Sequence, residues 1–456
     1  MKNCLLLMAA ALAAACSTTA APGVCCIGPD DCGRLGLAED RPCPAGQACV
    51  DLHCVVPSCS TQGCAADAPV CDVTTDVCTG CTSSSDCSRF SDTDLCEPQT
   101  GACVECLAQA DCTSAIEPVC DGGSCRGCRL DTECPSGACG DDGACVAETA
   151  IVYLHPAGQD IAPCLRGAPC REPQFAIRQT TVARNHVVMA PGAYTTQRVH
   201  ITPADTSAAA VFIHGHGARL SDTSFEGLFS ILIPTTVRDL KVEYPSGQAF
   251  VATQAVLERV HIHALIGFRT EGPVVMRDVS IDVTGAGTAI DNAGALVLDR
   301  GVLTGGAFGI RSDGVVDITN LLVYGTSDTA LELSSGRGSV SFTTVADSGS
   351  ASSSAGGIRC PITPNTVTVR SSIFWTPGSR PAAGGACNFS STIAGPVGAV
   401  GAMNLDPLFV DAAGRNYRLG LGSPARDMVD TGPAVDFEGD PRPQGARFDI
   451  GADEGL

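Results

Sequence analysis

Five heptads that align beneath one another decide the fold: VRDLKVE (237–243), LERVHIH (257–263), MRDVSID (276–282), LDRGVLT (298–304) and ITNLLVY (318–324). Their starts lie 19 to 22 residues apart, which is the length of one solenoid coil. The first, fourth and sixth positions are apolar or glycine in every heptad. Because side chains alternate along a strand, these positions predict the inside of the coil. The fifth and seventh positions then predict its outer surface.

The second and third positions break this alternation because both are polar, so we expect the backbone to turn a corner there. Charges at these positions alternate from coil to coil. The second position reads Arg238, Glu258, Arg277, Asp299 and Thr319, the third reads Asp239, Arg259, Asp278, Arg300 and Asn320, and a further strand gives Arg269, Asp291, Arg311, Glu332 and Arg359. With coils about 4.8 Å apart, each charge would lie between opposite ones. An exposed pair contributes only about 0.2–1 kcal/mol, so we interpret these ladders as setting register rather than as an active site.

This pattern resembles the pectin-lyase-like family, whose fold is an all-β, right-handed parallel β-helix. IVYLHPAGQD (151–160) and VVMAPGAY (187–194) are similar to the first coils of such domains, with a short Cys164/Cys170 loop between them. The resemblance implies a β-helix over residues 150–400, with Cys164 paired to Cys170.

The C-terminal segment resembles the choice-of-anchor Q domain. The matching stretches are DPLFVDAAGRNYRLGLGSPARD (406–427) and FDIGADE (448–454). Members of that family are surface proteins with a variety of anchors, and no reaction is tied to the signature. The resemblance implies that residues 401–456 cap the solenoid, with their Asp, Arg and Glu side chains closing its open end.

A cysteine-rich region precedes the solenoid, with 22 of the 28 cysteines between Cys25 and Cys145. Four-cysteine units of 22 to 25 residues recur there, and an acid precedes the second cysteine in most of them. The C-x-x-C junctions between units resemble a zinc ribbon. The export that residues 1–15 predict, described below, and the presence of a single histidine, His53, in the region favour disulfides instead. The cysteines expected to be bonded include Cys81, Cys87, Cys96, Cys103, Cys106, Cys112, Cys120, Cys125, Cys128, Cys134, Cys139 and Cys145. The units are similar to the arrays of myxobacterial surface lipoproteins, which implies an acidic stalk over residues 25–148.

Residues 1–15 predict a secretory signal peptide, with one basic residue and an apolar run. The sequence Ala13-Ala14-Ala15-Cys16 resembles a relaxed bacterial lipobox, which implies lipidation of Cys16 ahead of a short linker at 16–24. Ser17, in place of Asp, favours the outer membrane. The alternative is cleavage near Ala20 and full secretion. Because no anchor segment follows the C-terminal signature, we expect the lipid to be the membrane anchor.

The net charge of -21 is concentrated in the cysteine-rich region, where residues 17–150 carry 21 acidic and 5 basic residues. Nucleic acid binding needs a basic face, so we expect no nucleic-acid partner. We also expect a monomer without a cofactor. Calcium binding by the exposed acidic residues remains an alternative, although the sequence contains no EF-hand spacing.

The tripeptide Gly215-His216-Gly217 resembles a polygalacturonase motif. The Asn-Thr-Asp, Asp-Asp and Arg-Ile-Lys motifs that accompany it in that family are absent from residues 151–456. We therefore interpret the two glycines as a tight corner after a strand.

The outward positions of three successive coils form a better candidate site: Lys241, Glu243, His261, His263, Ser280 and Asp282. Glu243 and Asp282 lie two coils apart, about 9.6 Å at the backbone, and inverting glycosidases hold their carboxyls roughly 6.5–9.5 Å apart. His263 between them can act as acid, base or metal ligand. Catalysis would use Glu243, His263 and Asp282, and glycan or ion binding would add Lys241 and His261. A solvated outer face without a ligand is the third interpretation.

These features together predict a lipid-anchored surface protein whose β-helix is a non-catalytic scaffold or a carbohydrate and cell-surface contact module. The alternative is a polysaccharide lyase or glycoside hydrolase on the same fold.

Overall fold

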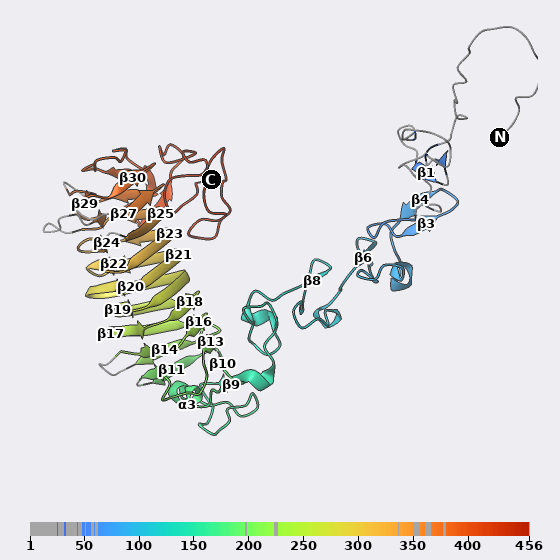
Figure 1. Cartoon of the computed structure of the whole chain (residues 1–456), viewed down its shortest axis with the longest axis horizontal. Coiled ribbons are helices and arrows are strands. Elements are labelled where there is room, and N and C mark those ends of the chain that lie inside the picture. The colour runs from blue at the N-terminus through green and yellow to red at the C-terminus, as the bar shows by residue number, and fades with distance from the viewer. Residues whose placement is uncertain are drawn as a thin grey trace, which may run out of the picture. The chain divides into compact units, whose positions relative to one another are not determined.

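The chain forms two compact units, residues 1–127 and 128–456, and each is described by itself. The computed structural model (Figure 1) describes residues 63–196, 198–222, 227–335, 337–349, 355–360, 366–376 and 380–455, together with Cys25, Cys32, Cys43, 48–50, 52–55 and Cys59. The predicted signal peptide, the lipidation site at Cys16 and the linker lie outside these residues. No helix within the described part of the chain has the length and apolar character needed to cross a bilayer.

The first unit consists of short antiparallel hairpins. Its strands are β1 (Ala48–Val50), β2 (His53–Val55), β3 (Val70–Asp72), β4 (Val77–Thr79), β5 (Leu95–Glu97), β6 (Ala102–Val104), β7 (Val119–Asp121) and β8 (Ser124–Arg126), with 3-10 turns η1 (Ser84–Cys87) and η2 (Gln109–Asp111). In each four-cysteine repeat the first cysteine bonds the third and the second bonds the fourth. These bonds are Cys59–Cys71, Cys64–Cys78, Cys81–Cys96, Cys87–Cys103, Cys106–Cys120 and Cys112–Cys125. The repeat at the start of the second unit has the same pattern, with Cys128–Cys139 and Cys134–Cys145.

This pairing explains how so small a repeat holds together. Cys96 and Cys103 face each other across a hairpin, and each is bonded to the segment that precedes the hairpin. Both strands are therefore tied to the turn ahead of them. In the C-x-x-C junctions, such as Cys103 and Cys106, the two cysteines bond partners in different repeats, so their sulfurs are already used in disulfides.

The acid before the second cysteine caps the turn. The carboxylate of Asp86 accepts backbone hydrogen bonds from Thr82 (2.9 Å) and Ser83 (3.1 Å). Asp111 makes the equivalent bonds one repeat later. The pKa values of Asp86 and Asp111 are lowered by these backbone hydrogen bonds. The recurrent acid is thus a capping residue.

The second unit is a stack of parallel strands (Figure 1). They are β9 (Ile151–Leu154), β10 (His186–Met189), β11 (Ala193–Thr196), β12 (Val199–Ile201), β13 (Val211–His214), β14 (Arg219–Asp222), β15 (Phe229–Ile231), β16 (Thr235–Arg238), β17 (Lys241–Ala252), β18 (Ala255–Glu258), β19 (His261–Thr270), β20 (Pro273–Asn292), β21 (Ala295–Gly305), β22 (Phe308–Ser312), β23 (Val315–Tyr324), β24 (Leu331–Leu333), β25 (Arg337–Ala346), β26 (Ile358–Arg359), β27 (Thr366–Arg370), β28 (Ile373–Trp375), β29 (Ala383–Gly384), β30 (Asn388–Ser390) and β31 (Ile393–Gly395). Three runs of parallel pairing follow the axis, beginning at β9, β11 and β12.

The five heptads stack in the predicted register. Val237 pairs with Leu257, Leu257 with Met276, and the series continues to Leu298 and Ile318. All five side chains are buried, so this column lies inside the coil. The predicted all-β parallel β-helix, preceded by a disulfide-rich region, is confirmed.

The third heptad position is a corner with a left-handed backbone. Its φ values lie between 53° and 59° at Asp239, Arg259, Asp278, Arg300 and Asn320, a conformation that costs non-glycine residues energy. Charge pairs between coils accompany it: Arg259 bonds both carboxylate oxygens of Asp239 (2.7 and 2.8 Å), and Arg300 bonds Asp278 in the same way (2.5 and 2.9 Å).

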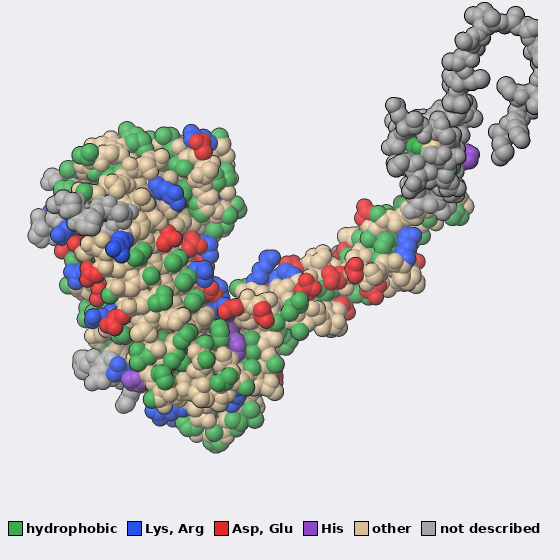
Figure 2. All heavy atoms as spheres, viewed as in Figure 1, with side chains coloured by type: hydrophobic (Ala, Val, Ile, Leu, Met, Phe, Trp, Pro, Cys, Tyr) green, Lys and Arg blue, Asp and Glu red, His purple; other side chains and the backbone are tan. Residues whose placement is uncertain are grey.

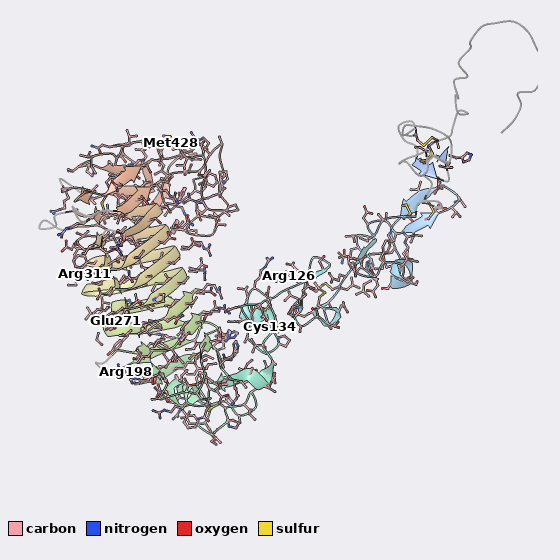
Figure 3. The ribbon with its side chains drawn as sticks, in the orientation of Figure 1. Arg126, Cys134, Arg198, Glu271, Arg311 and Met428 are labelled. Atoms are coloured by element: carbon pink, nitrogen blue, oxygen red, sulfur yellow. A yellow bond between two sulfur atoms is a disulfide. The ribbon has the colours of Figure 1, made fainter. Side chains whose placement is uncertain are left out.

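The second heptad position forms a similar ladder of charge pairs between coils. Glu258 accepts from Arg238 at 2.8 Å and lies 3.1 Å from Arg277. Farther along, Arg269, Asp291 and Arg311 stack in register as predicted. The side chain of Arg311 projects from the edge of the stacked coils (Figure 3).

The helix α3 (Pro173–Ile177) packs at the beginning of the solenoid. Glu172 caps it by accepting a hydrogen bond from Phe175 N at 2.6 Å. The predicted Cys164–Cys170 disulfide is present beside it, and a second disulfide joins Cys360 to Cys387.

The C-terminal segment, with the hairpin β32 (Phe409–Asp411) and β33 (Asn416–Leu419), packs on the outer side of the last coils. Ile450 clusters with Ile373 of β28, and the ring of Tyr417 lies 5.2 Å from that of Tyr324 on β23. We expected the segment to close the open end. Met403 of the segment pairs in parallel with Ile393 of the last strand, β31, and the other contacts cover apolar outward positions along the side of the coils.

A buried ion pair organises this segment. Arg442 lies 3.4 Å from Glu454, with side chains 0% and 1% exposed. Arg442 also donates to the carbonyls of Gly451 (2.9 Å) and Ala452 (2.5 Å), and Asp436 accepts backbone hydrogen bonds from Glu454 and from two other residues. The acidic and basic residues of the signature therefore hold its loops to one another.

Candidate functional site

The six outward residues of the predicted site share one face. Lys241, His261 and Ser280 are paired in register along β17, β19 and β20, and the seventh-position residues Glu243, His263 and Asp282 follow the same register. Their inward neighbours Val242, Ile262 and Ile281 are buried. Since side chains alternate along a strand, this burial directs the polar side chains outward.

On that face, contacts run from coil to coil. Glu243 accepts a hydrogen bond from Arg219 at 2.6 Å. The Nδ1 atom of His263 lies 2.9 Å from Asp282, and that of His261 lies 2.6 Å from Ser280 Oγ. The second oxygen of Asp282 accepts a hydrogen bond from Thr304 at 2.8 Å. Arg219 precedes the aligned heptads, so the sequence reasoning missed it. Its spacing was the available signal, because Arg219 stands two residues before Ser221 just as Lys241 stands two residues before Glu243.

The two carboxylates of the face are held by different partners. Glu243 turns toward Arg219, whereas Asp282 is bonded to His263. The exposed fractions of their side chains are 29% for Glu243 and 51% for Asp282. A catalytic acid–base pair needs two carboxyls free to reach the same bond. The observed contacts have the pattern of the corner ladders, and they present hydrogen-bonding groups to solvent.

The Gly215-His216-Gly217 tripeptide is a corner, as predicted. His216 and Gly217 have φ values of 48° and 74°. A Cβ added to Gly215 would lie 2.6 Å from the Asp239 carbonyl oxygen, so only glycine fits there. The Nε2 atom of His216 lies 2.7 Å from the carbonyl oxygen of Gly137.

That contact belongs to a second polar cluster, which sequence reasoning missed. The last cysteine repeat, residues 128–145, packs against the β-helix, and its 3-10 turn η3 (Asp131–Glu133) carries Asp131. Asp131 Oδ1 lies 2.8 Å from His214 Nδ1, and the two side chains are 3% and 1% exposed. His214 Nε2 in turn lies 3.0 Å from His186 Nδ1. Arg238 adds a bond to the Cys139 carbonyl at 3.0 Å and an ion pair with Asp141.

Burial shifts the pKa values in this cluster. The pKa of His186 falls from 6.5 to about 4, because burial and the neighbouring His214 disfavour its protonated form. Burial alone would raise the pKa of Asp131, but its hydrogen bond and charge interaction with His214 outweigh burial and lower it. These pKa shifts therefore favour an ionised Asp131 and a neutral His186.

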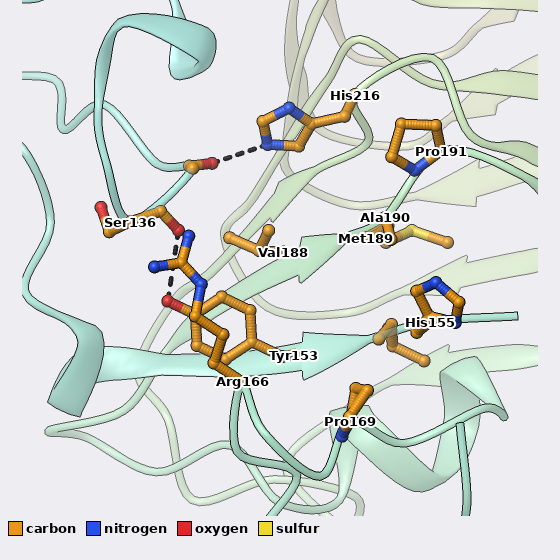
Figure 4. Close-up of a pocket in the computed structure, with 12 residues that line it drawn as sticks. Ser136, Tyr153, His155, Arg166, Pro169, Val188, Met189, Ala190, Pro191 and His216 are labelled. Carbon is orange, nitrogen blue, oxygen red and sulfur yellow. Dashed lines mark hydrogen bonds between the residues drawn. The ribbon is translucent and has the colours of Figure 1, made fainter. Parts of the chain in front are cut away.

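A pocket of about 300 Å³ lies beside the contact between the last cysteine repeat and the β-helix (Figure 4). Tyr153 and Val188 form its wall, with Arg166 on one side and His216 on the other. Tyr153 donates to the Ser136 carbonyl at 3.2 Å, so the pocket is bounded by both the cysteine repeat and the β-helix.

The comparisons with known proteins concern the fold alone. No family model and no curated protein matches the chain. A solved structure titled "Crystal structure of pectate lyase Pel9A" matches with a TM-score of 0.44 and 11% identity, covering 68% of this chain and 98% of that one.

Proposed function

We propose that this protein is a surface lipoprotein whose β-helix acts as a non-catalytic scaffold and carbohydrate contact module. The observation that carries the proposal is the ladder on the outward face. Glu243, His263 and Asp282 are each engaged with a neighbouring coil, so the face offers a fixed row of donors and acceptors rather than a free acid and base. A row of this kind suits the hydroxyl groups of an extended glycan.

Further support comes from rigidity. The polar residues are anchored by buried neighbours on stacked strands, and a preorganised surface loses little conformational entropy on binding. Figure 2 shows Lys and Arg side chains interspersed with Asp and Glu on the visible face of the coils. This mixture favours contact with a polar partner over burial against an apolar one.

The membrane part of the proposal rests on the lipobox-like sequence ending at Cys16. In it, the lipidated Cys16 anchors the protein in the outer membrane, and the choice-of-anchor Q-like segment completes the β-helix. Metabolic labelling with a palmitate analogue tests it: the wild type should incorporate label and Cys16→Ser should not. Equal labelling of both would contradict lipidation at Cys16.

A glycan array and a depolymerisation screen on the whole protein test the contact role. We expect binding without chain cleavage, and weaker binding for Glu243→Ala combined with Asp282→Ala. Depolymerisation that this double variant abolishes would instead establish the enzyme alternative. Binding and cleavage both unchanged in the double variant would eliminate this face as the site.

A further inference from the structure

One oxygen of the buried Asp131 carboxylate has no hydrogen-bond partner. The Oδ1 atom accepts a hydrogen bond from Cys139 N and lies 2.8 Å from His214 Nδ1. The Oδ2 atom is buried and makes no hydrogen bond to any residue that the structure describes, and the side chain is only 3% exposed. Because buried polar atoms are nearly always hydrogen-bonded, a donor from a bound molecule would complete this carboxylate.

Asp131 lines a pocket of about 310 Å³ between the 3-10 turn η3 and the corner of the early coils. The lining combines an apolar wall with polar residues of the turn and the corner. It includes Leu130, Asp131, Pro191, His216, Asp239 and Arg259. All of them belong to the second unit. The volume is within the range of about 300–1,000 Å³ that is typical of small-ligand sites.

The charge of the lining favours a cation. Two carboxylates, those of Asp131 and Asp239, and one guanidinium, that of Arg259, line the pocket, so negative charge is in excess when the histidine is neutral. Arg259 already bonds both oxygens of Asp239 (2.7 and 2.8 Å), which offsets its charge. The Asp131 carboxylate therefore sets the sign of the ligand charge that the pocket attracts.

His216 supplies a further hydrogen-bond acceptor. Its Nε2 atom lies 2.7 Å from the carbonyl oxygen of Gly137, and a carbonyl oxygen only accepts, so Nε2 carries the hydrogen. In the neutral ring the Nδ1 atom then keeps a lone pair. Together with Asp131 Oδ2 and the carboxylate of Asp239, the pocket offers acceptors from three side chains. A primary ammonium group has three N–H donors and no acceptor, which matches this set.

A guanidinium or a divalent metal ion would fit this site poorly. A guanidinium pairs with a carboxylate through two parallel hydrogen bonds, but Asp131 Oδ1 is already bonded to His214 and Cys139. Calcium takes about six to eight oxygen ligands, whereas the lining offers two carboxylates beside the guanidinium of Arg259. A compact ammonium group, which can bond single oxygens of separate carboxylates, fits better.

We propose that this pocket binds the primary ammonium group of an alkylamine, with the ammonium bonded to Asp131 Oδ2 and to Asp239 and the methylene groups packed against Leu130 and Pro191. A free amine and a lysine side chain share this chemistry. None of the residues of the outward Glu243 face lines the pocket, so the site is independent of the proposed carbohydrate contact.

Ligand-observed NMR titration of the full chain at about pH 7 tests this inference with n-butylammonium, n-butylguanidinium and n-butanol, which share one alkyl chain. Butylammonium should bind about fivefold more tightly than butylguanidinium, and butanol should show no saturable binding. A fourth probe, Nα-acetyl-lysinamide, separates the two sources of the ammonium group. Binding at least as tight as that of butylammonium would indicate a lysine side chain, and weaker binding would indicate a free amine.

Two substitutions test the carboxylates. Asp131→Asn should abolish butylammonium binding, but it can also weaken folding because the carboxylate is buried, so Asp239→Asn is the second variant. Asparagine fits that left-handed corner, since Asn320 has the same conformation (φ 55°) in the same column. Asp239→Asn should weaken binding about fivefold. The matched control is Asp278→Asn, which breaks the equivalent pair with Arg300 outside the pocket and should bind as the wild type does.

Three results would each overturn the proposal. The first is no saturable binding of butylammonium to the wild type, which would mean that water completes Asp131 Oδ2. The second is equal affinity for butylammonium and butylguanidinium. The third is an equal effect of Asp239→Asn and Asp278→Asn on butylammonium binding.

Discussion

His214 Nδ1 lies 2.8 Å from Asp131 Oδ1 across the contact between the last cysteine repeat and the β-helix, and both side chains are almost fully buried. Removing one partner of a buried pair leaves an uncompensated polar group and costs about 3–5 kcal/mol. We therefore expect His214→Ala to lower the free energy of unfolding of residues 128–456 by about that amount, measured by urea denaturation. Arg447→Gln, which breaks an exposed pair with Asp430, should cost under about 1 kcal/mol. Equal effects of the two variants would contradict a special role for the buried pair.

The same cluster predicts a loss of stability in mild acid. The folded-state pKa of His186, about 4, lies below its ordinary value of 6.5. Its contribution is therefore complete above pH 6.5 and is lost as the pH falls toward 4, because only the unfolded chain takes up the proton. The groups that affect it are His214, Asp141, Arg238 and Asp131. Since His186 is partly exposed, we expect a loss of roughly 1–2 kcal/mol between pH 7 and pH 4.5.

His186→Asn is the variant that tests this slope. Denaturation midpoints at pH 7 and pH 4.5 should differ less in the variant than in the wild type. A variant with the wild-type pH dependence would show that other groups cause the effect.

Asp453 in the C-terminal segment predicts the opposite pH dependence. Burial raises its pKa to about 6, and the nearby acids Asp436 and Glu438 add to this shift, while its carboxylate accepts a hydrogen bond from Leu419 N at 2.7 Å. Its stabilising contribution is complete below pH 3.8 and is lost as the pH rises through 6. Asp453→Asn should therefore raise stability by about 1–3 kcal/mol at pH 7.5, with the gain vanishing near pH 4. Differential scanning calorimetry at the two pH values measures this, and a gain of equal size at both would refute it.

The left-handed corner can be tested at Arg300, whose φ is 59°. Both Arg300→Gly and Arg300→Ala remove the bonds to Asp278, but only alanine keeps the backbone penalty. We expect the alanine variant to be about 1 kcal/mol less stable than the glycine variant. At Thr319, which has no left-handed backbone, the order should reverse, because glycine weakens an ordinary strand position.

The heptads made the fold predictable because burial, register and the corner all follow from one repeat of 19 to 22 residues. Val237 and its equivalents had to point inward, and the alternating charges at Arg238 and Asp239 excluded a shift of one coil. The same logic placed Glu243, His263 and Asp282 on one face. Their individual contacts were not predictable, because the direction in which an outward side chain turns depends on neighbours such as Arg219, outside the aligned heptads.

The contact between Asp131 and His214 was beyond sequence reasoning for another reason. The two residues are 83 positions apart and belong to segments with different repeats, so no periodicity relates them. The disulfide pairing was likewise not predictable from the cysteine spacing, because it depends on the hairpins. These set Cys96 opposite Cys103 and leave both facing the preceding turn. The covering of Tyr324 by Tyr417 depends on tertiary packing of a segment that has no coil period.

The charge columns also constrain how such a chain can change in length. Arg259 pairs with Asp239 and Arg300 with Asp278, so acid and base recur at the corner with a period of two coils. Deleting or duplicating one coil within this stretch would stack like charges, whereas a change of two coils would restore the alternation. The unit by which this solenoid can grow or shrink without penalty is therefore a pair of coils, and homologues of different length should differ by even numbers of them.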